Sequence, residues 1–97
     1  METYLFSEGS IKGIVLKNRI VRSATWEGMC DREGNPTGRL IDRYRALCRG
    51  GVGLIVTGDT YVRADGRELP GTMGIHSDDR IPALENLARM VHKEGVA

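Results

Sequence analysis

Apolar residues recur at intervals of three and four along the middle of the chain, a spacing typical of a helix with one face toward a core. The positions that share this face are Leu40, Ile41, Tyr44, Leu47 and Cys48. Thr37 can cap the helix at its start. Gly50 and Gly51 can end it, because glycine reaches the left-handed conformation without steric cost. The pattern therefore predicts a helix that begins after Thr37 and ends at about Arg49.

The same spacing returns near the end of the sequence and predicts a second helix. Its apolar face would carry Ile81, Leu84, Leu87, Ala88 and Val91. Ser77 is the expected cap, and the aspartates at 78 and 79 suit the positive end of the helix dipole. Pro82 is tolerated in the first turn, where its missing N–H has no partner to lose. Gly95 would end this helix, and the residues after it are typical of the start of a further strand.

Two apolar stretches alternate with these helices and predict parallel strands. The first is residues 19–25, and the second is residues 54–57, which are apolar on both faces, as in a strand fully buried in a parallel sheet. A small hairpin is expected within residues 4–16, and a tight hairpin turn at Asp65-Gly66. The order β-α-β-α is that of a parallel unit whose sheet needs further strands to cover it.

Composition narrows the classes of protein and of partner. The 97 residues are 40% hydrophobic and 28% charged, as in an ordinary soluble protein. The net charge of +1 builds no field that would attract nucleic acid or an anionic membrane. No apolar run approaches the ~20 residues that cross a bilayer, and the first residues lack the pattern of a secretory signal. We therefore expect a cytoplasmic chain with no nucleic-acid and no membrane partner.

The cysteines and histidines do not have the spacing of metal ligands, so no metal site is expected. Cys48 falls on the apolar face of the first helix, where we expect it to pack in the core. Cys30 lies in a polar loop and could be exposed. His76 precedes the cap of the second helix and His92 lies on its exposed flank. We predict a ligand role for neither histidine.

Candidate chemistry lies at the carboxyl ends of the two predicted strands, where barrel enzymes carry their reactive groups. These ends are residues 23–28 and 57–60, which combine small residues with hydroxyl groups. Small residues at a strand end let a flat ligand approach the backbone and receive a hydrogen bond from a rigid element. The pattern fits equally well with small residues that only pack beneath a helix.

Four blocks of sequence, taken in order, resemble the opening of the NADH:flavin oxidoreductase family, the old yellow enzymes. They are residues 17–25 (KNRIVRSAT), Pro36-Thr37, residues 49–57 (RGGVGLIVT) and residues 74–79 (GIHSDD). The resemblance implies an α/β fold, the N-terminal portion of a (β/α)₈ TIM barrel, with an N-terminal hairpin and then β-α-β-α. It implies FMN as cofactor, NADH or NADPH as reductant, and an activated alkene as small-molecule substrate, the reaction of an ene-reductase.

The resemblance also implies which residues meet the cofactor. Ser23, Ala24 and Thr25 match the segment that runs along the flavin, and Thr25 matches a hydroxyl position at the pyrimidine edge near O4 and N5. Gly58 and Asp59 match the end of the second strand at the same edge. We expect Asp59 to contribute its backbone and turn its carboxylate away, because an acid beside a reduced flavin is unfavourable.

Two segments depart from the family pattern. Many relatives carry proline followed by methionine or leucine in place of Ser23-Ala24, and Glu-Gly or Glu-Ala in place of Gly58-Asp59. Trp26 and Glu27 would extend beyond the flavin segment toward the entering substrate, which makes Trp26 the candidate substrate contact. A tryptophan at such a position is more often a packing residue.

The family's catalytic residues would lie beyond Ala97, so none is predicted within this chain. A barrel needs ~250 residues. Residues 1–97 would thus be an N-terminal fragment of an FMN-binding barrel without an internal boundary, inactive alone and partnered by the rest of the barrel or another chain. An alternative is a non-catalytic remnant that binds a partner protein through its open sheet edge. The mass of the natural gene product separates the two.

Overall fold

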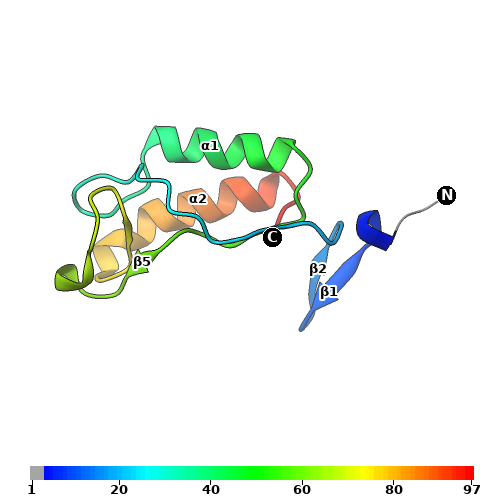
Figure 1. Ribbon diagram of the computed structural model, residues 1–97, viewed down its shortest axis with the longest axis horizontal. Coiled ribbons are helices and arrows are strands. Elements are labelled where there is room, and N and C mark those ends of the chain that lie inside the picture. Colours follow the sequence, from blue (N-terminus) through cyan, green and yellow to red (C-terminus); the bar gives the residue numbers. More distant parts are fainter. Residues whose placement is uncertain (1–3) are drawn as a thin grey trace.

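Two helices, three pairs of short strands and three 3₁₀ turns make up residues 4–97, the part of the chain that this computed structural model describes. The strands are β1 (Gly9–Ile11), β2 (Ile14–Leu16), β3 (Val21–Arg22), β4 (Leu54–Ile55), β5 (Thr60–Tyr61) and β6 (Met73–Gly74). The helices are α1 (Gly38–Arg49) and α2 (Ile81–Lys93), and the 3₁₀ turns are Tyr4–Phe6, Ala64–Gly66 and Asp78–Arg80. Figure 1 shows both helices on the same side of the strands, with the β1–β2 hairpin apart from them.

The hairpin expected within residues 4–16 is confirmed. β1 and β2 pair antiparallel, with Ile11 opposite Ile14 at the turn. The turn residues Lys12 and Gly13 have φ of 47° and 85°, the left-handed values that a two-residue hairpin turn requires at both central positions. The hairpin buries Leu16 but leaves its isoleucines exposed, so most of its apolar surface is not used within these residues.

β3 and β4 form the parallel pair that the sequence predicts, and α1 connects them. Val21 lies opposite Leu54 and Arg22 opposite Ile55. The Val56 amide donates to the Arg22 carbonyl at 3.0 Å, which continues the ladder beyond the assigned strands. Both carboxyl ends therefore lie at one edge of the pair.

The further strand expected after the second helix has its first residue in place. The amide of Ala97 donates to the Gly53 carbonyl at 3.1 Å, and its carbonyl accepts from the Ile55 amide at 2.8 Å. These bonds place Ala97 beside β4, on the edge away from β3.

The prediction that the second strand is fully buried is wrong for this chain, because Val56 is 45% exposed and Thr57 is exposed as well. Both helices cover the same side of the strands, so the other side has no cover within residues 4–97.

The hairpin turn predicted at Asp65-Gly66 is also wrong. The segment forms a 3₁₀ turn, in which the Gly66 amide donates to the Arg63 carbonyl at 2.9 Å. The strands on either side, β5 and β6, pair parallel and not antiparallel. Parallel strands need a long connection, and the turn is one bend within that connection.

The core lies where the two helices face each other and the strands. Its buried members are Leu40, Tyr44, Cys48, Val52, Met73, Leu87, Val91 and Val96. The predicted apolar face of α1 is confirmed, including the burial of Cys48. On α2 the prediction holds for the centre of the helix but not for Ile81 and Ala88, which are exposed. Within residues 4–97 no helix combines the length and apolar content needed to cross a membrane.

The helix ends agree with the sequence in position but not in every capping bond. Thr37 occupies the cap position of α1, yet its hydroxyl donates to the Met29 carbonyl and makes no capping bond. Ser77 makes no side-chain cap either, because the 3₁₀ turn Asp78–Arg80 intervenes before α2 begins. The predicted ends are confirmed, with Gly51 and Gly95 at φ of 103° and 78°.

Candidate functional site

The carboxyl ends of β3 and β4 lie against each other through backbone alone. Gly58 follows β4 and packs on the peptide between Thr25 and Trp26, which follow β3. A Cβ added to Gly58 would lie within van der Waals distance of the Thr25 carbonyl oxygen and 3.4 Å from the Trp26 Cα. Only glycine permits this approach. The structure therefore brings Thr25 and Gly58 together, as their places at two parallel strand ends predict.

The side chains along this edge are open. Ser23, Ala24 and Thr25 are exposed, as is Asp59, while Gly58 is half-buried. The Thr25 hydroxyl donates to the Ser23 carbonyl at 3.1 Å, a local bond that leaves its oxygen free to accept. The edge thus offers a hydroxyl and bare backbone to any flat group that lies on it.

Trp26 is held at the end of this edge by the loop that follows β5. Its indole N–H donates to the Thr72 hydroxyl at 3.1 Å, and that hydroxyl donates to the Leu69 carbonyl at 2.9 Å. The ring lies over Gly28, where a Cβ would come within 2.9 Å of it. With 44% of its surface exposed, Trp26 forms a fixed aromatic wall.

The segment after β3 is joined by backbone hydrogen bonds to the loop after β5 and to β6. The Cys30 amide donates to the Gly71 carbonyl at 2.9 Å, and the Gly74 amide donates to the Gly34 carbonyl at 3.0 Å. An open hollow of about 880 Å³ lies between the segment after β3 and the loop after β5, lined by Trp26, Gly28, Cys30, Asp31, Arg32, Arg67, Pro70 and Gly71. The loop after β5, in which the sequence predicts no site residue, thus contributes Arg67, Pro70 and Gly71 to the wall of the hollow.

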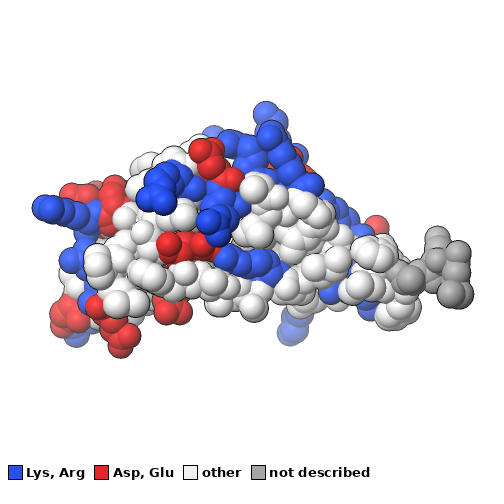
Figure 2. Space-filling view, turned by 45° about the horizontal axis from the view of Figure 1, so that its top comes forward, with Lys and Arg blue, Asp and Glu red and all other residues white. Residues whose placement is uncertain are grey.

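Glu27 does not extend toward a substrate, which corrects the sequence prediction. Its side chain is only 8% exposed and forms an ion pair with Arg22 of β3. A second guanidinium, from Arg43 of α1, lies 3.5 Å from the other carboxylate oxygen. Figure 2 shows the basic side chains that gather over α1, which carries this arginine. The signal in the sequence was an arginine at a strand end with an acid five residues later, but no periodicity relates such a pair.

Tyr44 lies beneath both strand ends and closes this cluster on the inside. It is 1% exposed, and the Arg22 guanidinium carbon is 5.9 Å from its ring centroid. Burial raises the pKa of Tyr44, while the backbone of Gly58 and the charge of Arg22 act in the opposite direction. The sequence pattern predicts Tyr44 as a core residue but does not indicate that it lies beside the site.

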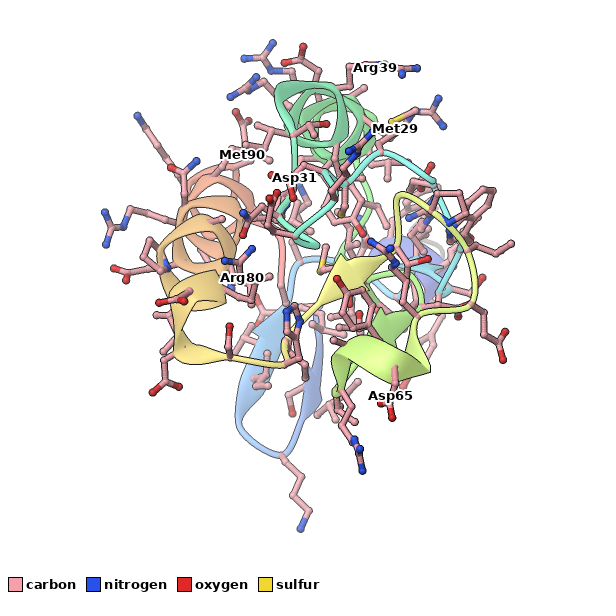
Figure 3. The ribbon with its side chains drawn as sticks, turned by 90° about the vertical axis from the view of Figure 1, so that its left-hand side faces the viewer. Met29, Asp31, Arg39, Asp65, Arg80 and Met90 are labelled. Carbon is pink, nitrogen blue, oxygen red and sulfur yellow. The ribbon has the colours of Figure 1, made fainter. Side chains whose placement is uncertain are left out.

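The loop at residues 30–35 is organised around Asp31. Burial acts to raise the pKa of Asp31, but hydrogen bonds from Asn35 and Glu33 and the charge of Arg80 outweigh it, so the pKa is lowered. Figure 3 shows Asp31 and Arg80 close together at this end of the molecule. Burial, with the nearby charge of Asp31, raises the pKa of Cys30 to about 11. Cys30 is half-buried and protonated at neutral pH, so it is not a reactive thiol.

The two histidines take no part in the strand-end site. His76 stacks on Tyr61 with ring centroids 4.9 Å apart, in the loop before α2 as expected. Its Nδ1 is buried without a hydrogen-bond partner among the described residues. His92 is exposed on α2. Over residues 4–97 no three His, Cys, Asp or Glu side chains gather in a way that could hold a metal ion.

Comparison with known proteins gives consistent matches across the chain. The sequence model of the NADH:flavin oxidoreductase / NADH oxidase family matches residues 4–97. An NADPH dehydrogenase of Geobacillus sp. (strain WCH70) is 40% identical over 96 residues, which are 98% of this chain and 28% of that protein. A 2-naphthoyl-CoA reductase solved with 2-naphthoyl-CoA has a TM-score of 0.91 at 31% identity, over 96% of this chain and 14% of that one.

An old yellow enzyme homologue from Zymomonas mobilis has a TM-score of 0.82 at 28% identity, over 97% of this chain and 26% of that one. The chain thus spans about a quarter of the length of the curated NADPH dehydrogenase that it matches. The old yellow enzymes are (β/α)₈ barrels, and the likeness confirms the predicted fold class: a hairpin and then β-α-β-α, as in the N-terminal portion of such a barrel. The assignment of individual residues to cofactor and substrate stays a prediction.

Proposed function

The chain belongs to the NADH:flavin oxidoreductase / NADH oxidase family, and from this premise we propose that it forms one wall of the flavin pocket of an FMN-dependent ene-reductase. The cofactors of this family are FMN and NADH or NADPH, as the resemblance implied. Bound FMN would supply hydride transfer from the nicotinamide to the substrate. We call the complete barrel that would contain this chain the whole protein, and its substrate would be a small molecule with an activated alkene.

One observation carries the proposal: the bare backbone edge where Gly58 packs against Thr25. A planar ring system needs a wall without projecting side chains, and a Cβ at residue 58 would push the two strand ends apart. The exposed residues 23–25 continue this edge on the β3 side. The residues present therefore fit a flat cofactor, at the end of the strands where barrel enzymes carry their sites.

Each residue of the edge would have a separate task. Ser23 and Ala24 would lie along the ring and exclude water from it. Thr25 would turn its hydroxyl from the Ser23 carbonyl to the pyrimidine edge and donate a hydrogen bond there, where a donor stabilises growing negative charge. Gly58 and Asp59 would present backbone to the same edge, with the exposed Asp59 carboxylate directed to solvent.

Trp26 would face the substrate, and the catalytic groups would come from other strands of the whole protein. The indole is fixed through Thr72 and lines the open hollow beside the flavin edge, which supports a role as a platform for a small molecule. The 2-naphthoyl-CoA reductase with the same local fold binds a small-molecule thioester, which also supports this class of substrate. By itself the 97-residue chain would be inactive.

The test is to remove only the Thr25 hydroxyl in the whole protein purified with FMN. Thr25→Val keeps the shape of the side chain, and it should slow flavin reduction by NADPH about 10- to 100-fold, since a hydrogen bond to a charged group contributes roughly 1.5 to 3 kcal/mol. Thr25→Ser keeps the hydroxyl and should stay near the wild-type rate. Equal rates for wild type and Thr25→Val, at equal flavin content, would remove Thr25 from the site.

A further inference from the structure

We propose that Glu27 is a positioning residue: its buried carboxylate fastens Arg22 and Arg43, and thereby holds residues 23–26 in the shape that forms the flavin edge. The inference rests on the proposed function for the task of this segment. It assigns to Glu27 a role that neither its place in the sequence nor the family resemblance indicates.

The ion pair between Arg22 and Glu27 links two residues that are close in the sequence. Arg22 ends β3 and Glu27 comes five residues later, so the pair ties together the two ends of a four-residue segment. Both side chains are mostly buried, at 15% and 8% exposed. A buried charge is strongly unfavourable without its partner. The conformation of residues 23–26 that keeps the pair together is therefore strongly preferred.

Glu27 also connects the segment after β3 to helix α1. Arg43 lies on α1 and reaches the second oxygen of the Glu27 carboxylate. Tyr44, the next residue of α1, is among the most buried side chains of the chain. The carboxylate thus joins the segment after β3 to a helix that the core holds in place, and position is transmitted from the core to the edge.

Few other contacts hold residues 23–26 in place. The side chains of Ser23, Ala24 and Thr25 are exposed, and the Thr25 hydroxyl bonds only within the segment. The remaining fastenings are the Trp26 indole and the backbone packing on Gly58. One nitrogen of Arg22, Nη1, is already buried without a partner among residues 4–97, so loss of the Glu27 carboxylate would leave more of this buried guanidinium unpaired.

The experiment neutralises Glu27 in the whole protein and follows both the flavin and the segment. Glu27→Gln keeps size and shape, and Glu85→Gln is the matched control, because Glu85 pairs with Arg89 on the exposed face of α2. FMN dissociation constants are measured by quenching of flavin fluorescence, and hydrogen exchange is measured on peptides that cover residues 23–26 and α2. Glu27→Gln should raise the FMN dissociation constant about tenfold and speed exchange at residues 23–26 by a similar factor, without change in α2. Glu85→Gln should change neither.

Arg43→Gln provides a second, milder variant, since Arg43 is 50% exposed and its loss leaves the Arg22 pair intact. It should shift both quantities in the same direction by a smaller factor, and it decides the matter if Glu27→Gln does not fold. A lower unfolding midpoint with unchanged FMN affinity and unchanged exchange at residues 23–26 would make Glu27 merely structural and overturn the proposal. If the wild-type protein binds no FMN, but Glu27→Gln still speeds exchange at residues 23–26, the proposed function is overturned and the role of Glu27 in holding this segment is kept.

Discussion

The helical layer of this chain is closed, whereas the strand layer is open. Leu40 of α1 is 2% exposed and belongs to the same buried cluster as Leu87 and Val91 of α2, so each helix has its partner within the chain. The strands expose Val21 and Val56. The two helices of this fold therefore pack on near neighbours, whereas each strand needs a further strand on either side to complete its cover.

The boundary between the two layers is an apolar groove of about 460 Å³ between α2 and the strand ends. Its apolar lining includes Ile55, Met73, Ile75, Leu84, Leu87 and Val91. Some of these residues belong to the buried core and others to the open strand layer. The groove therefore marks the line beyond which the helices no longer cover the strands. Substitutions in the helical layer, in the loop after β3 and in the strand layer test this contrast.

The largest effect is expected in the closed layer. Leu40→Ala deletes a fully buried side chain and leaves a cavity, which costs about 2 to 5 kcal/mol of unfolding free energy. Such a loss is a large part of the ~5–15 kcal/mol stability of a domain. In urea unfolding followed by circular dichroism, Leu40→Ala should unfold at a markedly lower urea concentration than wild type or show no transition at all. Leu69→Ala, at an exposed leucine, is the control and should leave the transition in place.

An intermediate effect is expected where the loop after β3 meets the helices. The Asp31 carboxylate accepts hydrogen bonds from the amides of Glu33 and Asn35 and from the Asn35 side chain. Asp31→Ala should therefore lower the unfolding free energy by about 2 kcal/mol. Because the pKa of Asp31 is lowered on folding, its stabilisation is present above the ordinary value of 3.8 and is lost as the pH falls through the lower folded value.

Urea unfolding of wild type and Asp31→Ala at several pH values checks this sign. The difference between them should be full at pH 6 and shrink as the solution is acidified below pH ~4. A difference that stays constant into acid would show that the charge of Asp31 is not what stabilises the loop.

The smallest effect is expected in the open layer. Val56→Ala shortens a side chain that is already 45% exposed, so the chain should lose less than about 1 kcal/mol. Val91→Ala makes the same deletion at a buried position of α2 and should cost about 2 kcal/mol in the same unfolding experiment. Equal costs for the two substitutions would mean that the strand layer is as well covered as the helical one.

The elements with a complete local signal could be predicted from the sequence. The spacing of apolar residues predicts α1, and the glycines at 51 and 95 predict where α1 and α2 end. These signals act within a few residues of each other. The meeting of Thr25 and Gly58 could be predicted as well, because the carboxyl ends of parallel strands share an edge. Their roles at a flavin stay predictions that rest on the resemblance.

Features set by distant partners could not be predicted. Asp65-Gly66 does carry turn chemistry, but the direction of β5 and β6 depends on a pairing across residues 62–72. The apolar pattern of residues 54–57 indicates a buried strand. Whether the strand is buried also depends on which other elements pack against it, and the pattern carries no information about these. Glu27 follows a strand end, where no periodicity fixes the direction of a side chain, and only the structure shows that it is buried.

The contact between Gly58 and the Thr25 peptide sets a limit on how this protein can be redesigned. Any side chain at residue 58 would separate the two strand ends, so a combinatorial library that varies this position would consist mostly of damaged scaffolds. Asp59 adjoins Gly58 and is exposed, and Trp26 brings its Cα to this contact while 44% of its surface stays exposed. Diversity intended to change substrate preference therefore belongs at residues 26 and 59, with residue 58 held as glycine in every variant.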